Sequence, residues 1–156
     1  MRIIPSVTVL TTLILLVAPL VLAEPEMSPK VQSVHAPIPV SGLTTQQIRL
    51  AIFSGMLNNK GVKWSLQGEA ANTIFARWDY RGEIAVMKIV YDEQNIQLFY
   101  VNASNKMMCT DFAGGICHSA RSGYFNYVPH LRKSIVRQVA LVSRDSSGTR
   151  TEGTQP

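Results

Sequence analysis

The alternation of apolar and polar residues from Thr73 to Val101 constrains the fold of this chain more than any other sequence feature. Two tight loops, at Arg81-Gly82 and at Glu93-Gln94, would fold this stretch into three antiparallel strands, because loop length fixes the register of a hairpin. Both registers then place one apolar set on the same face: Ile74, Ala76, Trp78, Ala85, Met87, Ile89, Tyr91, Ile96, Leu98 and Tyr100.

The opposite face of these strands is too apolar for an ordinary solvated surface. It carries Phe75, Arg77, Asp79, Ile84, Val86, Lys88, Val90, Gln97, Phe99 and Val101. An exposed apolar patch of this kind is typical of a contact site, so the sequence predicts binding residues at Phe75, Arg77, Val86, Lys88 and Phe99. In the alternative interpretation, the preceding linker or the later cysteine loop folds over this face.

Two amphipathic helices flank the strands. The residues from Thr44 to Gln47 have the pattern of a capping box, which predicts a helix over about Thr45–Asn58. Alternation from Val62 to Gln67 predicts a further strand, and apolar spacing predicts a second helix from Tyr124 to Val142. The expected fold is α+β: a four-stranded antiparallel meander with two helices packed on one face.

Residues 1–23 have the pattern of a cleaved signal peptide. Met1-Arg2 is a short basic start, Val7 to Val17 is almost entirely apolar, and Val21-Leu22-Ala23 suits cleavage after its last residue. An uncleaved membrane anchor is the alternative, but the apolar run is shorter than the roughly 20 residues that a span needs. We therefore expect export, and no integral membrane protein after cleavage.

Composition divides the remainder into three parts. Residues 24–42 contain Pro25, Pro29, Pro37 and Pro39 and predict an extended linker, in which a lone histidine, His35, would be inert. Residues 43–142 form the α-β-β-β-β-α domain. Residues 143–156 contain no large apolar side chain and predict a disordered tail.

The chain has two cysteines, Cys109 and Cys117. In an oxidising compartment a disulfide is the leading interpretation, and closing so short a loop would stabilise the domain by about 2.5 kcal/mol. The alternatives are two free thiols, or a metal pair completed by His118. A zinc site needs four ligands, and the sequence offers no matching second pair, so we expect no metal.

Positive charge is concentrated near the carboxyl end. The formal net charge is +5, and the segment from His118 onward contains six basic residues and two acidic ones. Arg132, Lys133 and Arg137 flank the apolar stripe of the second helix and are predicted binding residues. In an exported protein such charge indicates an anionic envelope component or an acidic protein and not nucleic acid; a plain solvated helix face is the alternative.

Few side chains in the sequence could carry catalysis. Cys109, Asp111 and His118 could form a thiol triad, but they fall in one loop, and a disulfide would remove the nucleophile. No phosphate-binding glycine loop or zinc-protease motif is present. We therefore predict a non-enzymatic binding module without a cofactor; the alternative is a small secreted enzyme that uses the Cys109/His118 loop.

Short motifs resemble a group of small, uncharacterised bacterial envelope proteins that are often lipoproteins. The resemblance covers about Ile48–Ile135 and lies in Ala51-Ile52, Gly55-Met56, Trp64, Ile89-Val90-Tyr91-Asp92, Ile96, Tyr100, Ile116, His118, Tyr124-Phe125-Asn126-Tyr127-Val128, Leu131 and Ile135. It implies an α-β4-α order and a bacterial envelope location. Together with the predicted export, we expect the protein in the bacterial periplasm or outside the cell, with an unknown envelope partner. It implies no activity, and the cysteine loop and the missing lipidation cysteine depart from the pattern.

Overall fold

The computed structural model describes residues 27–59 and 63–148. The predicted signal peptide lies outside these residues. The described elements are α1 (Pro29–His35), β1 (Ile38–Pro39), α2 (Thr45–Leu57), β2 (Trp64–Ala70), β3 (Thr73–Tyr80), β4 (Glu83–Tyr91), β5 (Asn95–Ala103), a 3-10 turn (Asn105–Met107), β6 (Cys109–Ala113), β7 (Ile116–Ala120) and α3 (Tyr124–Gly148).

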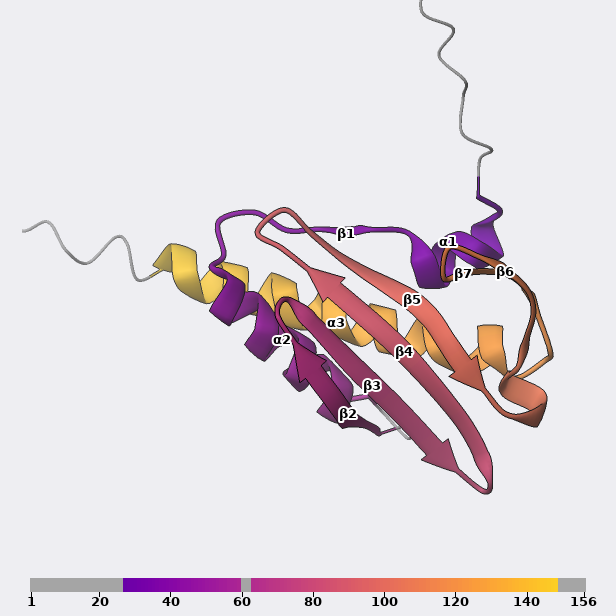
Figure 1. Ribbon diagram of the computed structural model, residues 1–156. Coiled ribbons are helices and arrows are strands. Elements are labelled where there is room, and N and C mark those ends of the chain that lie inside the picture. The colour runs from indigo at the N-terminus through magenta and orange to yellow at the C-terminus, as the bar shows by residue number, and fades with distance from the viewer. Residues whose placement is uncertain (1–26, 60–62, 149–156) are drawn as a thin grey trace, which may run out of the picture.

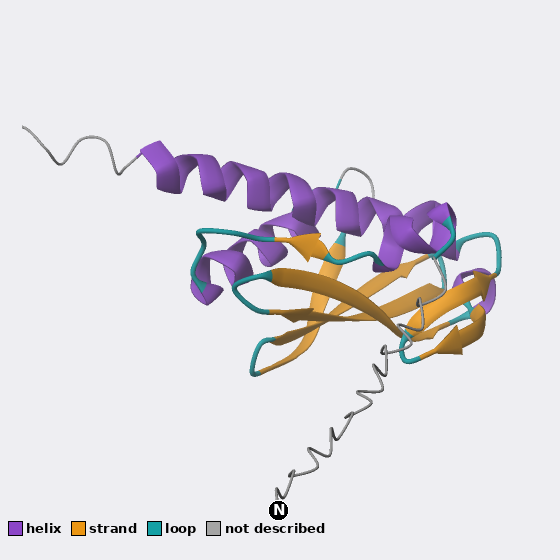
Figure 2. Cartoon of the chain, turned by 90° about the horizontal axis from the view of Figure 1, so that it is seen from above, coloured by secondary structure: helices purple, strands orange, loops and turns teal. Residues whose placement is uncertain are grey.

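The fold is α+β, with three α-helices and an antiparallel sheet of five strands in the order β1-β5-β4-β3-β2. Helices α2 and α3 lie side by side on one face of this sheet, and β6 and β7 form a separate hairpin at one end (Figures 1 and 2). The predicted four-strand, two-helix layout is therefore correct in class but misses α1, β1 and the second hairpin. None of the described helices is both long and apolar enough to cross a membrane.

The strand registers are the predicted ones, with Trp78 opposite Ala85 and Tyr91 opposite Ile96. All ten residues of the predicted apolar face are buried beneath the helices. At the β3–β4 turn, Arg81 and Gly82 have φ angles of 53° and 77°. Positive φ at both central positions matches the twist of the paired strands, so the turn itself fixes this register.

Helix α2 begins as predicted, because Thr44 and Gln47 form both hydrogen bonds of a capping box. The helix then packs closely on α3 at Gly55. A Cβ atom added at Gly55 would lie 2.8 Å from the Cα and the Cγ1 of Ile135. Glycine is therefore required for the two helices to approach at this point.

The predicted linker is wrong for its described part, because this segment is integral to the core. Val31, Val34 and Ile38 are buried, and β1 pairs with β5 through Ile38 opposite Ile96. Ser28 caps α1, and the proline at the first helical position, Pro29, suits a helix start. Pro29 thus begins a helix and Pro39 lies in an edge strand, and the segment is not an extended linker.

The predicted boundary of the tail is also wrong, because α3 continues to residue 148. Ser143 and Ser146 each donate a hydrogen bond to the carbonyl four residues earlier, at 2.9 Å. The Ser146 hydroxyl also accepts from Gln47 Nε2 at 3.0 Å, which ties this end of α3 to the start of α2. Residues 149–156 lie outside the described residues.

Candidate functional site

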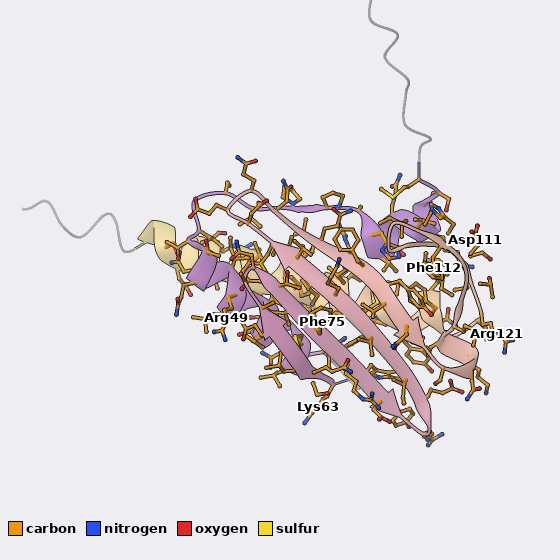
Figure 3. The ribbon with its side chains drawn as sticks, viewed as in Figure 1. Arg49, Lys63, Phe75, Asp111, Phe112 and Arg121 are labelled. Carbon is orange, nitrogen blue, oxygen red and sulfur yellow. A yellow bond between two sulfur atoms is a disulfide. The ribbon has the colours of Figure 1, made fainter. Side chains whose placement is uncertain are left out.

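Three residues of the predicted binding face form one row across the sheet. Phe75 in β3 lies opposite Lys88 in β4, and Lys88 lies opposite Phe99 in β5. All three side chains are partly exposed, and Lys88 Nζ lies 5.0 Å from the centre of the Phe99 ring. Since neighbouring strands are separated by about 4.8 Å, the backbones of Phe75 and Phe99 lie roughly 10 Å apart, on either side of the strand that carries Lys88. Figure 3 looks onto this face and labels Phe75 there.

The rest of the face is less available than the sequence indicates. Arg77 donates from Nη2 to the Asp79 carboxylate at 2.8 Å, so its charge is already compensated. Val86 lies opposite Arg77 and is only 3% exposed. Of the five predicted residues on this face, Phe75, Lys88 and Phe99 are therefore the ones that could reach a partner with uncompensated charge or free apolar area.

Described segments lie along the β5 edge of this face and reach Phe99. Helix α1 contacts α3, β5 and β7, and β1 pairs with the edge of β5, so the predicted linker lies along that edge. The hairpin tip reaches the same edge, where Tyr100 N donates a hydrogen bond to the Gly115 carbonyl at 2.7 Å and Gly115 packs against Phe99. In Figure 2, the described helices lie on the other side of β3 and β4.

The basic residues predicted on the second helix do not join this surface. Arg132 donates from Nε to the Ala36 carbonyl at 3.0 Å and from Nη2 to the Pro37 carbonyl at 3.3 Å, and burial lowers the pKa of its guanidinium. Arg132 therefore binds the backbone between α1 and β1. Lys133 and Arg137 are exposed, but α3 lies on the opposite side of the sheet from the row of Phe75.

The predicted disulfide joins Cys109 and Cys117, whose Cα atoms lie 5.9 Å apart. It closes the β6–β7 hairpin, which replaces the irregular loop expected there from composition. In this bonded form neither sulfur is a thiol, and the side chains of Asp111 and His118 are exposed. The arrangement needed for the alternative thiol enzyme is therefore not assembled at this hairpin.

Sequence reasoning missed His35, which is fully buried at the junction of four elements. Its Nδ1 lies 2.8 Å from the Leu98 carbonyl in β5, while its Nε2 lies 3.0 Å from Cys117 N in β7 and 3.1 Å from the Tyr124 hydroxyl in α3. The apolar residues around it, Val34 and Ile38, were the available sequence signal for a buried segment.

These partners fix the protonation state of His35. A carbonyl only accepts, so Nδ1 carries the hydrogen and donates to Leu98; a backbone amide only donates, so Nε2 is the unprotonated acceptor of Cys117 N–H. Burial lowers the pKa of His35, the hydrogen bond to Leu98 raises it, and the charge of His118 lowers it again. Burial also raises the pKa of Tyr124. His35 is thus a neutral structural hub.

A groove with aromatic residues in its lining lies beside the β3–β4 turn. It measures about 320 Å³, and its lining includes Trp78, Tyr127 and Glu83. The Trp78 and Tyr127 rings stack with centres 5.3 Å apart, and Glu83 accepts a hydrogen bond from Lys106 N at 3.1 Å. The aromatic rings of this groove therefore pack on each other, and the Glu83 carboxylate holds the 3-10 turn at Asn105–Met107.

No protein-family model, curated protein or solved structure matches this chain. The functional conclusion therefore rests on the residues of the chain itself.

Proposed function

We propose that this chain is an exported, non-enzymatic binding module that docks an acidic, apolar segment of an envelope protein on the open sheet face. The observation that carries the proposal is the row of Phe75, Lys88 and Phe99. Aromatic rings supply apolar contact area with little conformational freedom to lose, and a cation between them selects for a carboxylate. The disulfide supports an oxidising compartment, such as the periplasm or the extracellular space.

Charge complementarity argues for an acidic partner. Arg49 pairs with Glu69 and Arg77 pairs with Asp79, and neither ion pair involves Lys88. Asp79, the carboxylate in the same face set as Lys88, is therefore already paired with Arg77. A partner carboxylate placed over Lys88 would gain an ion pair without displacing one in this chain.

The test is a selection of displayed peptides on the immobilised protein, followed by affinity measurement of the enriched peptides. We expect peptides that combine carboxylates with aromatic or aliphatic residues. Phe75→Ser with Phe99→Ser should weaken their binding roughly thirtyfold, because truncating an interface anchor commonly costs about 2 kcal/mol. Lys88→Glu should abolish binding, and exchanging the peptide's carboxylates for lysines should restore it.

Leu66→Ser is the matched control. Leu66 is 50% exposed and lies opposite Ala76, on the helix side of the sheet, so its loss should leave affinity unchanged. Because Phe99 also packs on Gly115, Phe75→Ser alone is the fallback if the double variant unfolds. Folded Phe75→Ser and Lys88→Glu proteins that keep full affinity would remove the sheet face as the docking surface.

A further inference from the structure

Helix α2 carries two apolar stripes, and only the inner one is buried. The inner stripe faces the core and consists of Ile48, Ala51, Ile52, Gly55 and Met56. The outer stripe consists of Leu50, Phe53 and Leu57, which are spaced three and four residues apart and therefore share one helix face. Leu50 is 53% exposed and Leu57 is 63% exposed. A surface helix is normally polar on the side away from the core, so the outer stripe indicates a contact with another molecule.

The neighbouring edge strand extends this apolar surface. In the part of the chain that the structure describes, β2 is the last strand of the sheet and pairs on one side only, with β3. Leu66 lies opposite Ala76, on the side of the sheet that carries α2, and is 50% exposed. An ion pair between Arg49 and Glu69 joins α2 to β2, which lie side by side (Figure 1). We call the following residues the outer apolar surface: Leu50, Phe53, Leu57 and Leu66.

The shape of β2 argues against an additional strand at this edge. The register of its pairing with β3 shifts between Leu66 and Gly68, which marks a β-bulge. A bulge interrupts the ladder and twists an edge strand, and natural proteins use bulges to prevent pairing with a further strand. Glu69 adds a charge to the same edge. The contact is therefore made by side chains of the outer apolar surface and not by backbone hydrogen bonds of β2.

The outer apolar surface has the spacing of a surface that fits a second copy of itself. Leu50 and Leu57 lie at equal distances from the midpoint between Phe53 and Ser54. If the α2 helix of a second copy packed antiparallel across this midpoint, Leu50 of each copy would meet Leu57 of the other. Antiparallel packing also sets the positive end of each helix dipole beside the negative end of the other.

Leu66 falls near the same two-fold axis. Measured from the ion pair of Arg49 with Glu69, the midpoint of the outer stripe lies about 7 Å further along α2, and Leu66 lies about 10 Å back along β2. Because β2 runs back along α2, both distances point in the same direction (Figure 1). One axis can therefore relate both the helices and the edge strands of two copies, as a self-complementary contact requires.

The charges along this edge are compatible with the same axis. Lys63 is exposed just before β2, Glu69 lies near the other end of β2, and Figure 3 labels Lys63 and Arg49 near these two ends. The two-fold axis would bring Lys63 of one copy toward Glu69 of the other. Both carboxylate oxygens of Glu69 accept from Arg49, and each can accept a second hydrogen bond. Since Arg49 and Glu69 cancel, this part of a basic chain presents no net charge to repel the second copy.

We propose that the outer apolar surface joins two copies of this chain in a symmetric dimer with antiparallel α2 helices. The three leucines and Phe53 of each copy supply the apolar contact, and Arg49, whose guanidinium lies 4.8 Å from the centre of the Phe53 ring, contributes to its polar rim. The open sheet face lies on the other side of the sheet, so each copy keeps that face free. The dimer therefore does not depend on the proposed docking function.

The test is sedimentation velocity of the purified protein over roughly 1 µM to 1 mM, a range that includes weak dimers. We expect the average mass to rise with concentration toward that of two chains. Leu50→Gln with Leu57→Gln should raise the dissociation constant about a hundredfold or more, because both copies lose the same two anchors. Glutamine has a helix propensity close to that of leucine, so circular dichroism should show a folded variant.

Val136→Gln with Leu141→Gln is the matched control. These residues are 39% and 45% exposed on α3 and lie outside the outer apolar surface, so this variant should dimerise like the wild type. Equal weakening in the control would overturn the proposal, because it would show unspecific apolar association. A wild-type protein that stays monomeric throughout would overturn it too, and would leave the surface to a different partner. A folded Leu50/Leu57 variant with an unchanged dissociation constant would have the same consequence.

Introduced cysteines test the antiparallel arrangement separately. The native cysteines are joined in the Cys109–Cys117 disulfide, so an added oxidant acts on the introduced thiols. A mixture of Leu50→Cys and Leu57→Cys proteins should form more intermolecular disulfide than either protein alone, because position 50 of one copy meets position 57 of the other. If either protein crosslinks best with itself, the helices are not antiparallel and the proposed dimer is wrong.

Discussion

Acidification below pH 6.5 should destabilise this fold through His35. The neutral ring accepts a hydrogen bond from Cys117 N–H at 3.0 Å, so protonation of Nε2 would place two donors against each other in a fully buried site. The other titratable groups that act on the ring are Tyr124, whose hydroxyl lies 3.1 Å from Nε2, and His118, whose charge lowers the His35 pKa. Neither can compensate a buried positive charge.

The direction and the size of this pH dependence follow from the difference in proton binding between the folded and the unfolded chain. The pKa of His35 is lowered on folding from its ordinary value of 6.5. Below that value the unfolded chain therefore binds a proton that the folded protein does not, so the free energy of unfolding falls as the pH falls. The slope approaches about 1.4 kcal/mol per pH unit while the folded imidazole stays neutral, and the contribution is fully present above pH 6.5.

Urea unfolding monitored by tryptophan fluorescence measures this dependence, because Trp64 and Trp78 are both buried. We expect the free energy of unfolding to fall by up to about 1 kcal/mol between pH 6.5 and pH 5.5, because the unfolded imidazole is already half protonated at pH 6.5. His35→Gln should be less stable at pH 7.5, because Leu98 O and Cys117 N lose their partner, at a cost of about 1–3 kcal/mol for each unpaired group. It should also lose the pH dependence in this interval.

The matched control is His130→Ala, which removes an exposed imidazole that does not act on His35 and should preserve the slope. If His35→Gln does not fold, the His35 imidazole resonances of the wild-type protein report its protonation state directly. They should retain the pattern of a neutral ring with hydrogen on Nδ1 below pH 6.5. A His35 imidazole that titrates at its ordinary pKa in the folded protein would refute the reasoning. An equal pH dependence of stability in folded His35→Gln would do the same.

Three further predictions concern stability. Replacing Cys109 and Cys117 with serine should lower the free energy of unfolding by about 2.5 kcal/mol in urea titrations, and intact mass should show the wild-type protein two hydrogens lighter than its reduced form. Gly55→Ala should cost about 1–3 kcal/mol by overpacking against α3, whereas Gly68→Ala, whose added Cβ would meet its nearest neighbour at 3.9 Å, should tolerate the methyl group far better in the same assay. Thr44→Ala should lower stability by about 1 kcal/mol through the lost helix cap; an unchanged midpoint would show that the cap contributes nothing.

Local patterns determined the central sheet and one helix start. The period of two along β3, β4 and β5 and the short turns between them specify which residues face the helices, since a slip by one residue would reverse every side chain. The pairing of Trp78 with Ala85 and the capping box at Thr44 are therefore readable from neighbouring residues. The disulfide is similarly local, with a sequence separation of 8.

The role of the segment before α2 could not be read in this way. His35 finds its partners 63, 82 and 89 residues later, and only the folded sheet, hairpin and α3 bring them together. A proline-rich segment with few apolar residues has the composition of a linker. It is ordered here because β1 pairs with the edge of β5. The same long-range pairing removes Arg132 from the predicted binding surface, because its donors meet the carbonyls of Ala36 and Pro37.

The sequence by itself determined the α+β class, the registers of the β3–β5 strands and the composition of the open sheet face, because these depend on periodicity and loop length. The predicted packing of both helices on the buried face also places the basic helix on the side of the sheet opposite the open face. Only the tertiary structure brings the end of α2 against the middle of α3, because the approach of these helices is set by the packing of Gly55 on Ile135. Sites built between elements depend on such packing, which no local pattern encodes.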